Sequence, residues 1–186
     1  MRLGVYVGSF NPVHKGHIQV ANYLLDNNYI DKIEIIPTGN YWDKKNLIDV
    51  NFRIEMLKFY ESEKIYINET LNNCEYTYQV LNELKKDNNE LYLIIGSDNL
   101  PNFHLWKNID EILKNKVIVV SRKNIDMNSE AIKLNSDNFI LVDCKSMDIS
   151  STKVRNLIKE GNILDLDKYL DKEVINYILK NKLYRR

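Results

Sequence analysis

The sequence is poor in cysteine, proline and glycine, and neither charge predominates. It has two cysteines, three prolines and six glycines among 186 residues. Cys74 and Cys144 lie far apart along the chain and near no cluster of other metal-ligating side chains. We expect free thiols in a reducing compartment, packed as small apolar groups, with a disulfide as the less favoured alternative. Basic and acidic residues number 26 each, which argues against a nucleic-acid partner and against a polybasic membrane anchor.

Long hydrophobic runs and targeting signals are also missing from the sequence. No apolar run is long enough to span a bilayer, and the first ten residues lack the apolar stretch and cleavage site of a secretory signal. The sequence contains no repeat and no Gly/Ser linker. We expect a cytoplasmic protein without membrane contact, folded as one domain over residues 1–186.

Three familiar motifs are absent as well. The sequence contains no G-x-x-x-x-G-K-[ST], no G-x-G-x-x-G and no G-x-S-x-G. By these fingerprints the chain is neither a P-loop NTPase nor an NAD(P)-dependent Rossmann enzyme, and it has no nucleophile elbow.

Short apolar runs alternate with segments of helical periodicity along the chain. Strands separated by helices imply parallel βαβ units, and strands that are apolar on both faces imply a sheet covered by helices on both sides. We therefore predict a doubly wound α/β sheet. The predicted strands cover residues 2–7, 32–37, 65–68, 91–96, 117–121 and 139–143. The predicted helices cover residues 17–28, 51–62, 76–87, 109–115, 150–160 and 172–184, with a short further helix inside 122–138.

Residues of unusual chemistry follow the carboxyl ends of the predicted strands, where doubly wound folds bind their ligands. The stretches are 8–17, 37–45, 96–99, 121–123 and 148–155. Loops between strands and helices need glycine and proline for their turns. They do not need histidine, lysine, arginine and a Ser-Ser-Thr run at the same edge, so we expect a binding site there.

Two predicted helices begin with basic residues and without an acid in the first turn. One start holds His14, Lys15 and His17, and the other holds Ser151, Thr152, Lys153 and Arg155. A helix N-terminus carries about half a positive charge, so these starts favour a phosphate chain held between them. The alternatives are a plain serine N-cap, a surface or buried pair of histidines, and a metal site, which lacks a clear third ligand.

The sequence places no nucleophile beside a base. Imidazoles, lysine, arginine and helix starts can position substrates and stabilise developing charge. Such groups suit transfer at phosphorus, where the protein needs little covalent chemistry.

These residues resemble the nucleotidylyltransferase superfamily with the H-x-G-H signature. "GSFNPVHKGH" (residues 8–17) resembles its first motif and "ISSTKVR" (149–155) its second, which implies a Rossmann-like parallel sheet. Within the superfamily, the chain resembles the bacterial nicotinate-nucleotide adenylyltransferases along nearly its whole length. The similar segments include "FRIEMLK", "EYTYQVLNEL", "LYLIIGSDNLPNFHLWKNIDEIL" and "YLDKEVINYILKNKLY". Three features depart from the family pattern: Asn11 replaces an acid, Ser97 an alanine, and "YWDK" at Tyr41–Lys44 the usual P-P-H-K.

The resemblance implies that the 5′-phosphate of nicotinate mononucleotide attacks the α-phosphorus of ATP, with Mg²⁺ on the phosphates and no residue assigned as a metal ligand. A phosphate is already ionised near pH 7, so no general base is required. The implied catalytic residues are His14, His17, Lys44 and Arg155. The implied ATP-binding residues are Gly8, Ser9, Phe10, Gly96, Asp98, Ser151 and Thr152, with Asp98 as a ribose or metal contact or else a buried capping residue.

Four residues are implied to bind the other substrate: Tyr76, Thr77, Trp106 and Lys107. Trp106 would stack on the pyridine ring, unless it is an ordinary core or surface tryptophan. Backbone N–H groups near Thr77 and Trp106 would bind the carboxylate, which predicts a preference for nicotinate over nicotinamide mononucleotide. The alternative functions are a pantetheine-phosphate adenylyltransferase and a non-catalytic nucleotide sensor on the same fold. A homo-oligomer stays open.

Overall fold

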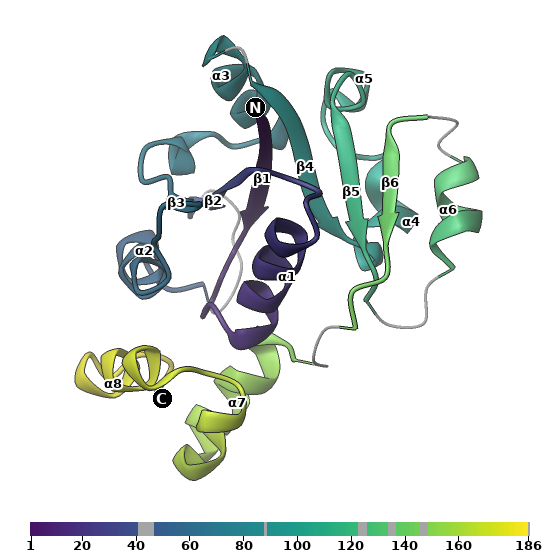
Figure 1. Cartoon of the computed structure of the whole chain (residues 1–186). Coiled ribbons are helices and arrows are strands. Elements are labelled where there is room, and N and C mark those ends of the chain that lie inside the picture. Colours follow the sequence, from purple (N-terminus) through teal and green to yellow (C-terminus); the bar gives the residue numbers. More distant parts are fainter. Residues whose placement is uncertain (41–46, 88, 123–125, 134–136, 146–148, 186) are drawn as a thin grey trace.

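Six parallel strands form one sheet, and helices pack against both of its faces in the computed structural model (Figure 1). The structure describes residues 1–40, 47–87, 89–122, 126–133, 137–145 and 149–185. The strands are β1 (Arg2–Gly8), β2 (Lys32–Pro37), β3 (Ile65–Ile67), β4 (Glu90–Gly96), β5 (Lys116–Val120) and β6 (Phe139–Val142). Their order is β3-β2-β1-β4-β5-β6 and every pairing is parallel. The predicted Rossmann-like, doubly wound sheet is confirmed.

The helices divide between two hydrophobic cores, one on each face of the sheet. The first core receives buried side chains from α1 (Lys15–Asp26), α2 (Val50–Lys58), α7 (Ser151–Glu160) and α8 (Lys172–Lys180). The second core receives side chains from α3 (Thr77–Leu84), α4 (Leu100–Phe103), α5 (Ile109–Ile112) and α6 (Met127–Lys133). Short 3₁₀ helices cover Leu71–Asn73, Lys85–Asp87, Ser97–Asn99 and Ile163–Lys168.

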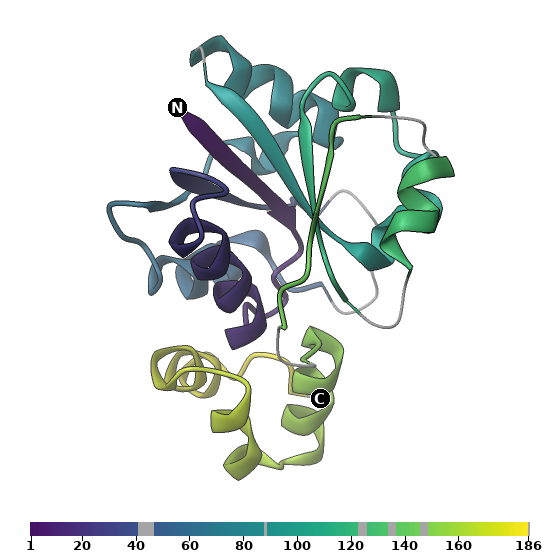
Figure 2. The ribbon, with the colours of Figure 1, turned by 45° about the vertical axis from the view of Figure 1, so that its right-hand side comes forward.

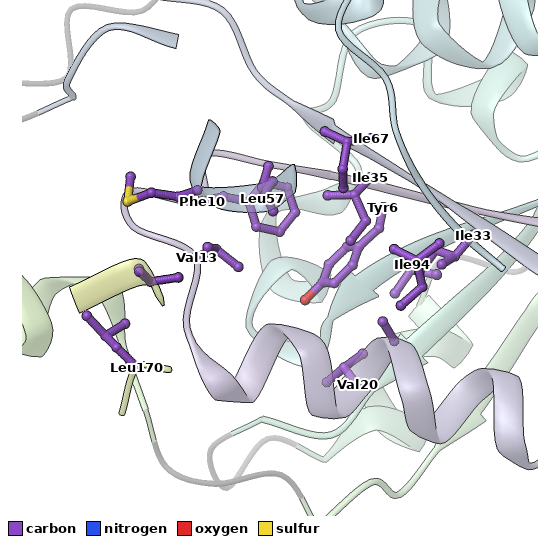
Figure 3. Close-up of a cluster of buried hydrophobic side chains, with 14 of the residues drawn as sticks. Tyr6, Phe10, Val13, Val20, Ile33, Ile35, Leu57, Ile67, Ile94 and Leu170 are labelled. Atoms are coloured by element: carbon purple, nitrogen blue, oxygen red, sulfur yellow. The ribbon is translucent and has the colours of Figure 1, made fainter. Parts of the chain in front are cut away.

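Five of the six strands supply both cores because successive side chains point to opposite faces, whereas β3 supplies only the first. In β1, Tyr6 faces the first core, whereas Leu3 and Val5 face the second. Figure 3 shows the first core, where Tyr6 lies among Val20, Ile35 and Ile94. Burying a large apolar side chain contributes about 1.5–3 kcal/mol to folding, so the continuous apolar runs of the sequence are explained by a sheet that is covered on both sides.

The helix ends differ from the predicted ranges more than the strand ends do. The helix predicted over 51–62 ends at Lys58, because Tyr60 N–H and Glu61 N–H turn back to the carbonyls of Leu57 and Lys58. The helix predicted over 109–115 has its regular part over Ile109–Ile112. Gly161 ends α7 in the left-handed conformation, with a φ of 77°, as its sequence position predicts.

Two smaller features concern the cysteines and the length of the helices. Cys74 and Cys144 are both free, as predicted, and Cys144 is buried. No helix among the described residues has the length and apolar character needed to cross a membrane.

The strand order reverses next to β1, which pairs with β2 on one side and with β4 on the other. This switch point is where doubly wound sheets bind ligands, outside the carboxyl ends of the strands. The helices α7 and α8 lie beyond that end of the sheet, close to the start of α1 (Figure 1 and Figure 2).

Candidate functional site

The loop between β1 and α1 is held in an uncommon conformation. Phe10 has a φ of 44°, a left-handed conformation that costs a non-glycine residue about 1–3 kcal/mol. Its ring is buried, 2% exposed, and packs edge-on against Tyr6 and His17 at centroid distances of 5.3 and 4.9 Å. A Cβ at Gly8 would lie 3.2 Å from that ring, so glycine here makes room for Phe10.

A fully buried arginine, Arg53, binds the backbone of the same loop. Arg53 donates to the carbonyls of Ser9 and Ile48 at 2.8 and 3.1 Å and to Asn40 Oδ1 at 3.0 Å. Burial lowers the pKa of Arg53 to about 10, so the guanidinium stays charged at neutral pH. Arg53 therefore ties the loop after β1 to the segment after β2.

His14 and His17 stack against each other at the start of α1. Their ring centroids are 3.7 Å apart and their planes differ by 20°. His14 N–H donates to His17 Nδ1 at 3.2 Å, so a neutral His17 carries its proton on Nε2. The buried Nδ1 of His14 has no hydrogen-bond partner among the described residues. The predicted convergence of the two rings is confirmed, but they are less exposed than a surface rim implies: His14 is 3% exposed and His17 is half-buried.

Both histidines are neutral in the absence of a ligand. Burial, with a smaller contribution from the charge of Arg122, lowers the pKa of His14 to about 3. Burial also lowers the pKa of His17 well below its usual value, with smaller contributions from His14 and Arg122. A neutral His17 can donate one hydrogen bond from Nε2 without the cost of burying a charge.

The start of α7 is joined directly to the β1–α1 loop. Ser151 Oγ donates to the Pro12 carbonyl at 2.9 Å, and Arg155 Nη1 donates to the Asn11 carbonyl at 2.8 Å. Arg155 Nη2 also donates to Thr152 Oγ1 at 3.1 Å. The two helix starts are therefore neighbours, as predicted. The N-cap alternative holds for Ser150, whose Oγ accepts from Lys153 N–H at 3.2 Å.

The buried Asn11 joins the C-terminus to the same loop. Its Oδ1 accepts from Tyr184 Oη at 2.9 Å and from Ile48 N–H at 3.4 Å. Asn11 is the position where the family pattern has an acid. An amide oxygen fills the acceptor role here without placing a carboxylate in the buried loop.

Two of the basic side chains at these helix starts do not face an anion site. Lys15 Nζ donates to the Asp167 carbonyl at 2.5 Å, and Lys153 Nζ lies 4.8 Å from the ring centroid of Tyr169. Both side chains are engaged by the 3₁₀ helix Ile163–Lys168 and its flank, which fold back onto the two helix starts. A first turn without an acid is also not special, since α2 and α3 share it.

A cavity of about 300 Å³ opens at the switch point, between the ends of β1 and β4. We call it the switch-point cavity. Seven residues predicted from the sequence line it: Gly8, Ser9, Phe10, His17, Gly96, Trp106 and Ser151. Four others with polar groups also line it: Tyr6, Thr38, Asn99 and Arg122. His14 lies against His17, outside the lining, and Asp98, Thr152 and Arg155 are likewise outside it.

Arg122 is the main functional candidate that the sequence prediction missed. It follows β5 in the stretch "SRK", so its place after a strand was the available signal. No ion pair involves Arg122 among the described residues. The guanidinium therefore lines the cavity without a direct ion pair to a described residue, and the Asp98 carboxylate lies near it over Gly96.

Two predicted positions need separate comment. Lys44, like the rest of the Tyr41–Lys45 loop, lies outside the described residues. Asp98 is exposed, so the alternative of a buried capping residue was wrong. Its carboxylate and the Arg122 side chain both lie over Gly96, where a Cβ would collide with them.

A second cavity of about 420 Å³ shares Trp106 with the first. We call it the Trp106 cavity. All four residues predicted to bind the second substrate line it: Tyr76, Thr77, Trp106 and Lys107. Glu75, Leu105 and Ile112 complete the lining. The indole is half-buried and packs on Phe103, with ring centroids 4.8 Å apart. Thr77, the first residue of α3, lines this cavity. Because the first N–H groups of a helix lack intrahelical partners, the start of α3 offers hydrogen-bond donors here.

Two of the backbone amides in the Trp106 cavity already donate hydrogen bonds within the protein. Trp106 N–H donates to the Phe103 carbonyl at 3.0 Å, and Tyr76 N–H donates to Gln79 Oε1 at 2.9 Å. Neither group is available to a ligand. The amides of Thr77 and Lys107 are the remaining candidates in that wall.

Among the described residues, no group of three or more histidine, cysteine, aspartate or glutamate side chains could hold a metal ion. Of the residues that the structure describes, none with a carboxylate lines the switch-point cavity. A metal ion in this cavity would need most of its ligands from a bound molecule.

The fold and the cavities are typical of a class of α/β proteins that bind nucleotides at the switch point of the sheet. The sequence matches the cytidylyltransferase-like family over residues 5–157. The chain belongs to this family, and the resemblance seen in "GSFNPVHKGH" and "ISSTKVR" is confirmed.

Curated relatives carry a more specific name. The chain is 32% identical to the probable nicotinate-nucleotide adenylyltransferase of Clostridium tetani, over 97% of this chain and 98% of the relative. It is 34% identical to the protein of the same name from Fusobacterium nucleatum subsp. nucleatum, again over 97% and 98% of the two chains.

A solved structure is similar over nearly the whole chain. It is the nicotinic acid mononucleotide adenylyltransferase of Plasmodium falciparum complexed with NaAD, with a TM-score of 0.83 and 26% identity. The match covers 98% of this chain and 97% of that chain. The same protein complexed with APC matches with a TM-score of 0.81.

Proposed function

We propose that this chain, acting as one domain over residues 1–186, transfers the adenylyl group of ATP to nicotinate mononucleotide. The products are nicotinate adenine dinucleotide and pyrophosphate. The names of the curated relatives support this reaction, and so do the molecules named in the two Plasmodium falciparum structures.

One observation in this chain carries the proposal: the switch-point cavity and the Trp106 cavity meet at a single indole. A dinucleotide needs a phosphate site flanked by a site for each base. Trp106 stands between a cavity lined by His17, Arg122 and the α7 start and a cavity lined by an aromatic and amide wall. The phosphate of a mononucleotide bound in the second would reach into the first.

The reaction needs no general base. The second pKa of a phosphate monoester is about 6, so the attacking oxygen is largely ionised at pH 7. The new bond joins this oxygen to the α-phosphorus of ATP, and the bond to the bridging oxygen of the β-phosphate breaks, which releases pyrophosphate. Catalysis then rests on positioning the two substrates in line and on stabilising charge.

The proposed roles in the switch-point cavity follow from the proton positions and charges. His17 donates from Nε2 to a phosphate oxygen that gains charge, and His14 fixes the proton on Nε2 through its backbone N–H. Arg122 pairs with a substrate phosphate. The first amides of α7, at Ser151 and Thr152, bind the triphosphate, since an anion is favoured at a helix N-terminus.

Other predicted residues act from the edge of the cavity. Arg155 holds the loop carbonyl of Asn11 in place and adds positive charge near the α7 start. Gly8, Ser9, Phe10 and Gly96 shape the wall along which ATP lies. Lys44 keeps the phosphate-neutralising role implied by the resemblance.

The proposed pocket for nicotinate is the Trp106 cavity. The indole covers the face of the pyridine ring, and the amides of Thr77 and Lys107 donate to the carboxylate. Charge-assisted hydrogen bonds are roughly twice as strong as neutral ones, so this wall favours the acid over the amide. Tyr76 stacks on Tyr78, with ring centroids 6.1 Å apart, and closes the side of the pocket.

Mg²⁺ fits this site as a companion of ATP. Mg²⁺ prefers oxygen ligands and is commonly held by one or two carboxylates together with substrate phosphates. The exposed Asp98 beside Gly96 is the one predicted carboxylate close enough to the cavity to add a protein ligand. When bound, the ion neutralises phosphate charge.

The proposal is tested by following pyrophosphate release with purified protein, Mg²⁺, ATP and nicotinate mononucleotide, and by identifying the dinucleotide by mass. We expect release only when both substrates are present. ATP cleavage that does not depend on the acceptor would indicate hydrolysis instead of transfer, and binding of ATP without turnover would support the non-catalytic sensor.

A further inference from the structure

We propose that the hydroxyl groups of Tyr6 and Ser97 are positioning groups that hold the Arg122 guanidinium in the switch-point cavity for a substrate phosphate. This inference rests on the proposed function, since it takes Arg122 to bind a phosphate. Neither hydroxyl is needed for a strand or a turn, and both contact the same arginine.

Ser97 fixes the backbone of Arg122. Its Oγ donates to the Arg122 carbonyl at 2.6 Å and accepts from the Arg122 N–H at 2.8 Å. Ser97 is fully buried, so both bonds are shielded from water. They join the end of β4 to the end of β5, on the two sides of the residue that carries the charge. An alanine, which the family pattern has at this position, could form neither bond.

Tyr6 fixes the other end of the side chain. Arg122 Nη2 donates to Tyr6 Oη at 3.2 Å, while the Tyr6 ring is buried in the first core (Figure 3). The ring sits in a packed core on β1, so its hydroxyl is a rigid anchor. A long side chain loses considerable rotamer freedom when it binds, and an anchored guanidinium has less of this freedom to lose.

Gly96 completes the arrangement between these two points. A Cβ at this position would lie 2.8 Å from Arg122 Cδ. The aliphatic part of Arg122 therefore crosses the glycine on its way from the Ser97 clamp to the Tyr6 hydroxyl. The path is set at three places, which points the guanidinium at the cavity in advance of any ligand.

The test is a double-mutant cycle read by equilibrium binding. Nicotinate mononucleotide and, in parallel, ATP are titrated calorimetrically into the wild type, Tyr6→Phe, Ser97→Ala and Arg122→Ala, and into the two double variants. Tyr92→Phe is the matched control, because Tyr92 is also buried in the first core but its hydroxyl bonds to Glu90, at the opposite end of the sheet.

We expect Tyr6→Phe and Ser97→Ala each to raise the dissociation constant of the mononucleotide about three- to tenfold, as for one lost hydrogen bond. Neither change should matter once Arg122 is alanine, and Tyr92→Phe should have no effect. In steady-state kinetics, the KM for the mononucleotide should rise with little change in the KM for ATP. If Arg122→Ala lowers the melting temperature, Arg122→Met, which keeps an aliphatic side chain without the charge, replaces it in the cycle.

Two results would overturn the inference: an equal loss from Tyr6→Phe in the presence and absence of Arg122, or no loss from either hydroxyl variant. Failure of the proposed function is read separately, from the absence of dinucleotide product with the wild type. An intact cycle without product would refute the proposed reaction and leave the positioning roles of Tyr6 and Ser97 standing.

Discussion

The burial of His14 predicts that the free energy of unfolding of the protein falls on mild acidification, by an amount that follows from the lowered pKa of this residue. Its ring is 3% exposed, and burial lowers its pKa to about 3, against about 6.5 in an unfolded chain. Below pH 6.5 the unfolded state binds a proton that the folded state does not, so the free energy of unfolding falls as the pH falls. From pH 7.5 to pH 5.5 this linkage amounts to about 1.4 kcal/mol for His14. The lowered pKa of His17 acts in the same direction.

The assay is urea denaturation at pH 7.5, 6.5 and 5.5 for the wild type and His14→Asn. The variant is expected to lose about 1.4 kcal/mol of the pH-dependent difference, whatever its absolute stability. His104→Asn is the control, because His104 is exposed and lies away from the stacked pair; it should keep the wild-type loss. Identical pH dependences for the wild type and His14→Asn would show that His14 is not held neutral by burial.

Three further predictions concern the substrates. His17→Ala should lower turnover about 10²–10³-fold, as for the loss of one transition-state donor. It should also lower the melting temperature, because the His17 ring packs on His14 and Phe10. Normal turnover in a folded His17→Ala variant would refute the role of His17 as a donor. Arg155→Ala should raise the KM for ATP well above that for the mononucleotide, and equal effects on the two KM values would count against its place at the α7 start. Trp106→Ala should weaken nicotinate and nicotinamide mononucleotide alike, by about 1–3 kcal/mol of stacking energy, so a selective loss of one of them would contradict a stacking role.

The strands could be predicted almost to the residue because a strand that is buried on both faces has a continuous run of apolar residues. The strand predicted over 32–37 is β2, residue for residue. Helix ends were harder, since Phe59 and Tyr60 continue the pattern of α2 but serve tertiary contacts. Tyr60 Oη donates to Asp171 at the start of α8, a partner that no local pattern can reveal.

The candidate site was predictable where it depends on the ends of strands and not where it depends on contacts across the sheet. The walls holding Thr77 and Trp106 follow β3 and β4, and they meet as expected in one cavity. Arg122 was missed because its direction is set by Tyr6 and Ser97, which are distant in sequence. The contacts of Lys15 and Lys153 could not be predicted because the segment that engages them follows α7, far from Lys15 in sequence.

The central claim is tested most directly by a competition between acceptors. Purified protein receives ATP, Mg²⁺ and an equimolar mixture of nicotinate mononucleotide, nicotinamide mononucleotide and phosphopantetheine, and the early products are quantified by mass. The product ratio reports the ratio of kcat/KM values. The account predicts at least about a tenfold excess of nicotinate adenine dinucleotide, since 1.4 kcal/mol corresponds to a factor of ten. Equal amounts of the acid and amide dinucleotides, an excess of the amide product, or adenylylated phosphopantetheine as the main product would contradict it.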